Sequence, residues 1–222
     1  MSTKTITKLY HGTSDRYLSA ILSKGLIPRG RRKGNWQKVP SRPGAVYLTK
    51  SYPFQFAFNS MRKGTEKLVV FEVALSKLSN AQLEPDEDFI AWCISHDEGR
   101  PLVEANAEVR QAFRTYSHLW TESLAEMGCC AYRGAIPASA ITRYCLLDLD
   151  HYPSFEGMMM VLRHSDLDPA DSMDGHQQLV QLIFGDRGDL PLVDFPCDLD
   201  ELLDRSGIEV VTLHGNVEED AA

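Results

Sequence analysis

Two short segments, residues 9–14 and 44–49, most constrain how this chain can fold. The first reads Leu-Tyr-His-Gly-Thr-Ser, so an apolar pair that ends a predicted strand is followed by a histidine and small or polar residues. Gly12 has no Cβ and lets a ligand approach the backbone. The second segment reads Gly-Ala-Val-Tyr-Leu-Thr and alternates as a half-buried strand does. His11 at one strand end and Tyr47 on another strand therefore predict a cleft.

The hydrophobic pattern predicts helices alternating with strands. Helices are expected at 14–24, 53–62, 103–116 and 117–127, and strands at 5–10, 44–49, 67–74, 129–132 and 143–149. The segment 67–74 is almost continuously apolar, which is typical of a central strand. Residues 85–89 place three acidic residues after a proline, which predicts an exposed turn or a helix start. They lack the spacing of a calcium-binding EF-hand loop, and we assign no metal ligand.

A basic, glycine-containing loop is predicted from Arg29 to Gly44. It contains most of the clustered positive charge of the chain together with Trp36. One interpretation is a solvated loop, because runs of charge usually face water. The alternative is a lid that binds phosphate through arginine side chains and stacks the tryptophan on a base.

The composition is that of a globular protein. The chain has 222 residues, of which 43% are hydrophobic, enough for one substantial domain with an appendage. A net charge of −8 argues against a general attraction to nucleic acid or to anionic membranes. Five cysteines without regular spacing, no secretory signal and no apolar run of transmembrane length predict a cytoplasmic protein with no membrane partner.

The composition changes beyond Asp150. Residues 151–222 are rich in aspartate and interrupted by glycine and proline, yet they keep apolar runs such as 158–162 and 179–184. These runs make the segment too hydrophobic for a disordered acidic tail. We therefore divide the chain into a domain at 1–150 and an acidic, mostly helical C-terminal extension at 151–222 that packs on it.

A third segment, Cys-Ala-Tyr-Arg-Gly-Ala-Ile-Pro at 130–137, completes a pattern. His-Gly-Thr after a short strand, Val-Tyr-Leu-Thr before a helix, and this late strand with its Ile-Pro turn together resemble the ADP-ribosyltransferase superfamily. That superfamily includes the poly(ADP-ribose) polymerases, the diphtheria-toxin class and the NAD-dependent tRNA 2′-phosphotransferases. The resemblance covers about residues 5–150. It implies an α+β fold in which split antiparallel sheets surround an NAD cleft.

The resemblance also implies roles for individual residues. The backbone of Gly12 would bond the nicotinamide amide, His11 the adenosine ribose, and Tyr47 would stack on nicotinamide. Thr13 would add a hydroxyl contact, and Arg29 would meet phosphate. Such a site would hold NAD as a substrate in the geometry that cleavage of its ribose–nicotinamide bond requires.

The sequence departs from the family at one position. Relatives with a histidine-tyrosine-glutamate set place the glutamate at the start of the late strand, which here reads Cys129-Cys130-Ala131-Tyr132. Glu126 is the nearest carboxylate upstream and Glu122 lies one helical turn earlier. A shifted register would make Glu126 catalytic, because a carboxylate near the ribose stabilises developing positive charge.

Three functions remain open at this point. The first is NAD-dependent mono-ADP-ribosylation of a macromolecular acceptor, protein or nucleic acid, with release of nicotinamide. The second is NAD-dependent removal of an RNA 2′-phosphate, because the tRNA 2′-phosphotransferases also lack the glutamate. The third is a catalytically degenerate module that binds NAD, ADP-ribose or a protein partner.

Overall fold

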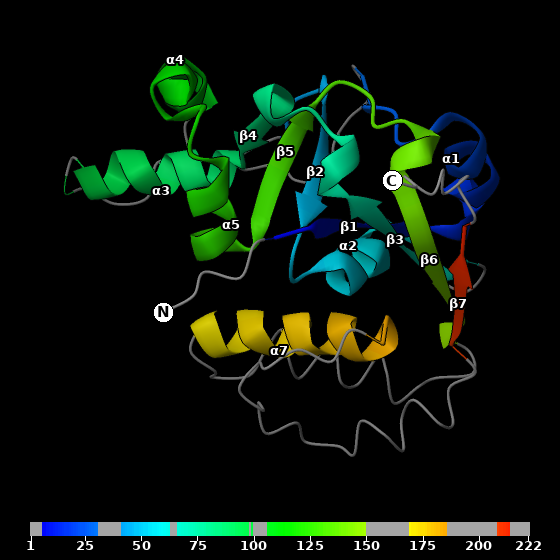
Figure 1. Ribbon diagram of the computed structural model, residues 1–222. Helices are drawn as coiled ribbons and strands as arrows, with labels where there is room; N and C mark the ends of the chain where they lie inside the picture. Colours follow the sequence, from blue (N-terminus) through cyan, green and yellow to red (C-terminus); the bar gives the residue numbers. More distant parts are fainter. Residues whose placement is uncertain are drawn as a thin grey trace, which may run out of the picture.

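The computed structural model describes residues 6–30, 41–62, 66–97, 99, 106–149, 169–185 and 208–213. Its strands are β1 Lys8–Ser14, β2 Ala45–Thr49, β3 Leu68–Ala74, β4 Leu83–Pro85, β5 Cys129–Arg133, β6 Ile141–Leu147 and β7 Glu209–Thr212. Its helices are α1 Leu18–Lys24, α2 Pro53–Ser60, α3 Glu87–Asp97, α4 Asn106–Tyr116, α5 Trp120–Met127 and α7 Pro169–Ile183. Figure 1 shows this mixture of helices and antiparallel strands, which confirms the predicted α+β class.

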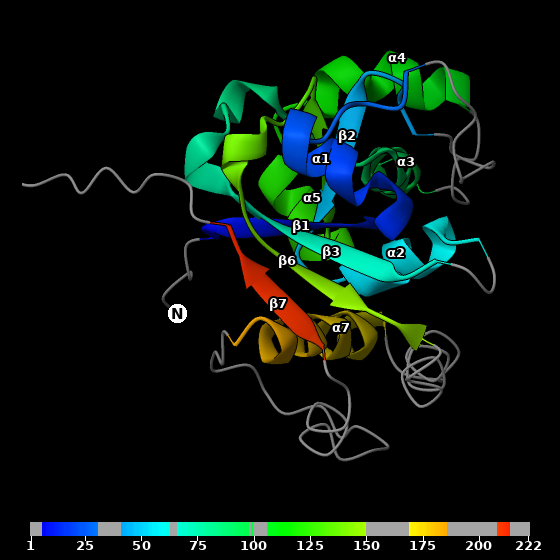
Figure 2. The same ribbon diagram turned by 90° about the vertical axis from the view of Figure 1, so that its right-hand side faces the viewer.

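The strands form one sheet in the order β4-β5-β2-β1-β3-β6-β7. We expected two small sheets around a cleft. The two halves are instead joined, but only through the pair Tyr10↔Thr49 between β1 and β2. Figure 2 shows the consequence, because β2 runs steeply across the direction of β1, β3 and β6. The sheet is therefore continuous in pairing and splayed at its centre.

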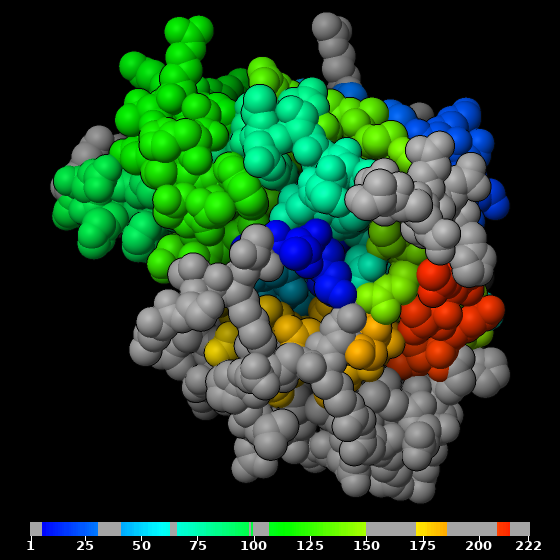
Figure 3. Space-filling view, in the orientation of Figure 1, coloured from blue at the N-terminus to red at the C-terminus, as the bar shows by residue number. Residues whose placement is uncertain are grey.

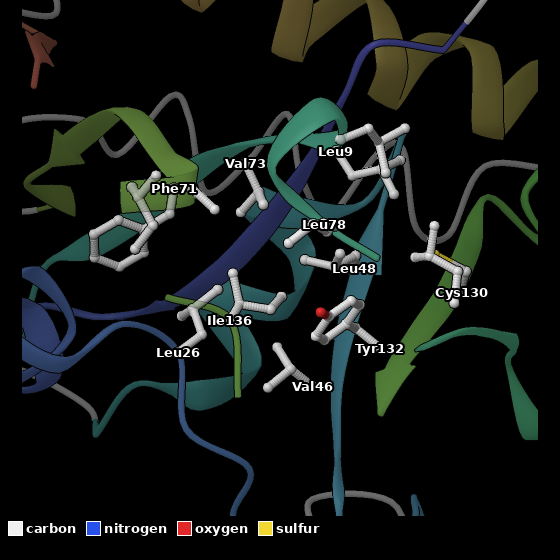
Figure 4. Close-up of a cluster of buried hydrophobic side chains, with 14 of the residues drawn as sticks. Leu9, Leu26, Val46, Leu48, Phe71, Val73, Leu78, Cys130, Tyr132 and Ile136 are labelled. Atoms are coloured by element: carbon white, nitrogen blue, oxygen red, sulfur yellow. The ribbon is translucent and has the colours of Figure 1, made fainter. Parts of the chain in front are cut away.

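Hydrophobic side chains cover both faces of β3. Val69, Phe71 and Val73 lie in a cluster that also contains residues of β2 and β5, and Figure 4 shows this cluster between the two halves of the sheet. Leu68 and Val70 point to the opposite face, where α2 and α7 pack. Burial on both faces explains why this strand is almost continuously apolar in sequence.

The C-terminal extension contributes both a helix and a strand to this core. Leu179, Val180 and Ile183 of α7 are buried in the cluster that contains Tyr10 and Phe54. β7 pairs with β6 at the edge of the sheet and lies next to it on the surface (Figure 3). The described part of the extension thus shares a core with the first domain. Within the described ranges, no helix has the length and apolar character that crossing a bilayer demands.

Some boundaries differ from the sequence prediction for physical reasons. β1 runs through His11 to Ser14, because β3 pairs with it along its whole length. Helix α3 extends to Asp97, well beyond the turn or helix start that residues 85–89 predict, because its buried face packs on α4. β4 was missed because three residues are too few to show a period. The hydroxyl of Ser14 caps the next helical turn by accepting the N–H of Arg16 at 3.4 Å.

Candidate functional site

The candidate site lies where β1 and β2 separate, and two backbone hydrogen bonds fix how β1 is turned there. The N–H of Asp15 donates to the carbonyl of Lys67 at 3.0 Å, and the N–H of Leu75 donates to the carbonyl of Thr7 at 2.9 Å. The direction of the backbone N–H and C=O groups alternates from residue to residue along an antiparallel strand. Odd-numbered residues of β1 therefore direct these groups toward β3. The backbone groups of Gly12 consequently face β2.

β2 is turned in the complementary way. The N–H of Lys50 donates to the carbonyl of Gly128 on the β5 side at 2.9 Å. The backbone groups of Tyr47 therefore face β1. Continuing the register of the Tyr10↔Thr49 pair would set Tyr47 opposite Gly12, yet the two strands do not pair there.

The imidazole of His11 occupies this gap in the ladder. Its Nδ1 lies 2.9 Å from the carbonyl oxygen of Tyr47. A carbonyl only accepts, so Nδ1 carries the hydrogen and donates it. Burial lowers the pKa of His11, although the bond to the Tyr47 carbonyl acts in the opposite direction. The ring is therefore neutral at physiological pH, and Nε2 is a hydrogen-bond acceptor.

A cavity of about 800 Å³ opens at this split. His11, Gly12 and Thr13 of β1, Tyr47 of β2 and Arg29 all line it. The structure therefore brings five of the six predicted site residues to one cavity. Its volume lies within the range of small-molecule sites.

Gly12 is required by packing at this position. A Cβ built on it would lie 1.7 Å from the carbonyl oxygen of Pro53 at the start of α2. Helix α2 thus approaches β1 more closely than any side chain at this position permits. The backbone of Gly12 remains at the cavity wall, and its binding of a ligand stays a prediction.

The hydroxyl of Tyr47 is held by polar partners that the sequence did not reveal. It donates to Glu87 Oε2 at 2.6 Å and accepts the backbone N–H of Arg42 at 2.6 Å. Arg42 Nε is 2.5 Å from Glu87 Oε1, and its guanidinium also pairs with Glu84. Burial raises the pKa of Tyr47 far above its usual value, and the Glu87 carboxylate adds to this. The phenol therefore stays neutral.

Arg29 carries a buried donor that meets no acceptor among the residues that the structure describes. Its guanidinium donates to the carbonyl of Ser41. Its Nε is buried and finds no hydrogen-bond partner among the described residues. A buried unpaired donor costs free energy, so a ligand acceptor at this wall would stabilise the site. Residues 31–40 of the predicted basic lid lie outside the described residues.

Glu126 lies apart from these groups. It is exposed in the last turn of α5 and is not one of the described residues that line the cavity. Its catalytic role stays a prediction. The acidic run 85–89, for which the sequence predicts an exposed turn or a helix start, begins helix α3 at Glu87 and also reaches the cavity, because Asp86, Glu87 and Asp88 all line it. The proline before three acids was the only sequence signal for this wall.

Comparisons with known proteins add little to this geometry. No protein family matches the chain, and no curated protein matches it either. A similar solved structure is a chain named EcPltA, with 14% sequence identity and a TM-score of 0.41, covering 68% of this chain and 82% of that one. Similarity at this level says nothing about activity.

Proposed function

We propose that this chain binds NAD in the cavity at the split sheet and transfers ADP-ribose to a macromolecular acceptor, with release of nicotinamide. The observation that carries the proposal is the convergence of His11, Gly12 and Tyr47. They come from two strands, with His11 and Tyr47 lying 36 residues apart in sequence, and they meet where the ladder opens. These are the residues on which the resemblance to ADP-ribosyltransferases rests.

The chemistry of the wall fits the parts of NAD. The N–H and C=O of Gly12 face the side where β2 has diverged, and together they match the donor and acceptor of the nicotinamide carboxamide. Neutral His11 offers Nε2 to a ribose hydroxyl. The buried Nε of Arg29 suits a diphosphate oxygen. Thr13, on the same strand as His11, adds a hydroxyl to the cavity wall.

The network at Tyr47 supports a positioning role for its ring. Glu87 and the backbone of Arg42 fix the phenol oxygen from two sides. A ring held in this way presents one orientation to a flat aromatic ligand such as nicotinamide. Fixing the leaving group and the ribose in one geometry is what cleavage of the bond between them needs.

Labelled NAD tests the proposal. Protein incubated with adenine-labelled NAD and a cell extract is expected to yield label on protein or nucleic acid and free nicotinamide in equal amount. Tyr47→Ala is expected to abolish both, while His118→Ala, a change at an exposed histidine outside the cavity, leaves both unchanged. Binding of NAD without nicotinamide release would instead identify a degenerate module.

One observation favours the RNA 2′-phosphotransferase reaction as a second candidate. The β5 residue that lines the cavity is Cys129, where a glutamate would stand in the glutamate-using relatives. Transfer of a phosphate to NAD requires side chains that bind phosphate oxygens, such as Arg29, more than it requires a carboxylate. An RNA with an internal 2′-phosphate that loses it only when NAD is present would establish this activity.

A further inference from the structure

One part of the cavity wall is built where β4 meets β5. β4 and β5 pair with the register Glu84↔Ala131 and Pro85↔Cys130. The next position along this register sets Asp86 beside Cys129. Figure 1 shows α5 alongside β5, with β4 and α3 next to them.

Ser123 of α5 links the two backbones at this position. Its hydroxyl accepts the N–H of Asp86 at 3.0 Å and donates to the carbonyl of Cys129 at 2.8 Å. Ser123 is fully buried, so this link is shielded from water. Asp86 and Cys129 are thereby held as neighbours, and both line the cavity.

The side chain of Asp86 is oriented by the start of α3. Its Oδ1 accepts the N–H of Asp88 at 2.9 Å, which is an N-cap interaction. The cap fixes the carboxyl group at the cavity wall by a bond that does not involve Glu87 or Arg42. A carboxyl group therefore stands one strand away from the β5 position at which the glutamate-using relatives carry theirs.

We propose that Asp86 is the carboxylate that faces the ribose during ADP-ribose transfer, supplied by the β4–α3 junction in place of a glutamate on β5. The inference rests on the proposed function and names a residue for its chemistry. Glu87 is less suited to the task, because both of its oxygens are engaged by Arg42 and by the Tyr47 hydroxyl.

The ionisation of Asp86 agrees with this assignment. Removal of the carboxyl from water raises its pKa to about 7, with Glu87 and Asp88 acting in the same direction and Arg42 against it. The groups that interact with it from all sides are Glu87, Asp88, Arg42, Tyr47, Cys129 and Cys130. A group with this pKa is able both to carry charge and to take a proton near neutral pH.

The bond between ribose C1′ and the pyridinium nitrogen breaks, and its electron pair leaves with neutral nicotinamide. Ionised Asp86 faces the positive charge that develops at C1′. The acceptor nucleophile forms the new bond to C1′, and its proton passes to the Asp86 carboxylate and then to water.

Asp86→Asn tests the inference, because asparagine caps a helix as well as aspartate does and only the charge is lost. We expect nicotinamide release to fall about 100-fold, while NAD affinity measured by calorimetry stays unchanged. The melting temperature should not fall and should rise at neutral pH, because the neutral amide removes a buried charge. The wild-type rate should rise with pH through about 7 as the carboxyl ionises, and this rise should vanish in the variant. Asp97→Asn removes the same charge from the far end of α3 and should change nothing.

Specific outcomes would overturn the inference. An Asp86→Asn enzyme with the wild-type rate and pH profile removes Asp86 from the chemistry, and so does a loss seen in Glu126→Gln instead. If Asp86→Asn does not fold, Asp86→Ser, which also caps, replaces it in the same comparison. Wild-type protein that neither binds NAD nor releases nicotinamide overturns the proposed function itself. If the wild type turns over NAD and the Asp86 variant does so at the same rate, only the present inference is overturned.

Discussion

His11 has two separable tasks, and substitutions at this position distinguish them. Nδ1 donates to the Tyr47 carbonyl at 2.9 Å, which satisfies a backbone group at the split in the sheet. Nε2 is the acceptor assigned to a ribose hydroxyl. The amide nitrogen of asparagine reaches the place of Nδ1, whereas that of glutamine lies near the place of Nε2. His11→Asn therefore keeps the first task and loses the second.

The structure sets the size of each effect. In His11→Ala the Tyr47 carbonyl loses its donor at a half-buried site, which costs about 1–3 kcal/mol of stability. For a chain of this length, 2 kcal/mol corresponds to about 4–8 °C in melting temperature. His11→Asn should retain nearly the wild-type melting temperature. Its NAD affinity should fall about 2–10-fold, the value of one net hydrogen bond.

Thermal unfolding and calorimetry with NAD, carried out on Ala, Asn and Gln variants of His11, check this division. We expect His11→Asn to be stable and to bind weakly, and His11→Gln to show the larger loss of stability. A His11→Ala protein as stable as the wild type would refute the structural role of Nδ1. Unchanged NAD affinity in His11→Asn would remove Nε2 from the site.

Three further predictions concern the frame of the site. Gly12→Ala should lower stability by about 3 kcal/mol or more in urea unfolding, because its Cβ would overlap the Pro53 carbonyl; a neutral effect would contradict the observed packing of α2. Arg42→Ala should lower stability by about 2–4 kcal/mol, because it leaves the Glu87 carboxylate without its cation. The loss should be smaller than for a fully buried ion pair, since a quarter of the Arg42 side chain is exposed; equal unfolding midpoints would show the network to be dispensable. Burial lowers the pKa of His176 from 6.5 to about 4, so the unfolded chain binds the proton more readily and stability should fall by up to about 3 kcal/mol as pH drops between these values. His176→Asn should lose this part of the pH dependence, and an unaltered dependence would refute it.

Local features of the fold could be predicted from sequence because they depend on neighbours along the chain. The apolar run 67–74 indicated a central strand, and β3 is buried on both faces. The helix predicted to end at residue 127 does end there as α5, and Gly128 after it adopts the left-handed conformation that ends helices. The motif residues His11, Gly12 and Tyr47 were recognised from short segments, and all three line the cavity.

The pairing of distant segments was decided only in three dimensions. The acidic run 85–89 indicated a turn or a helix start, and α3 does begin there. Nothing near Asp86 in the sequence shows that β4 lies beside β5, so its place at the cavity was hidden. The partner of the His11 imidazole was equally hidden, because the Tyr47 carbonyl needs a side-chain donor only where β2 leaves β1.

The sequence by itself thus indicated most of the strands and helices, although not β4 or β7, and it indicated which residues could contact a ligand. The tertiary structure decided which of those residues face each other, and it added Asp86, Glu87 and Arg42 to the site. The physical reason is that periodicity and capping act within a few residues, whereas sheet register depends on burial and hydrogen bonding between strands far apart in the chain.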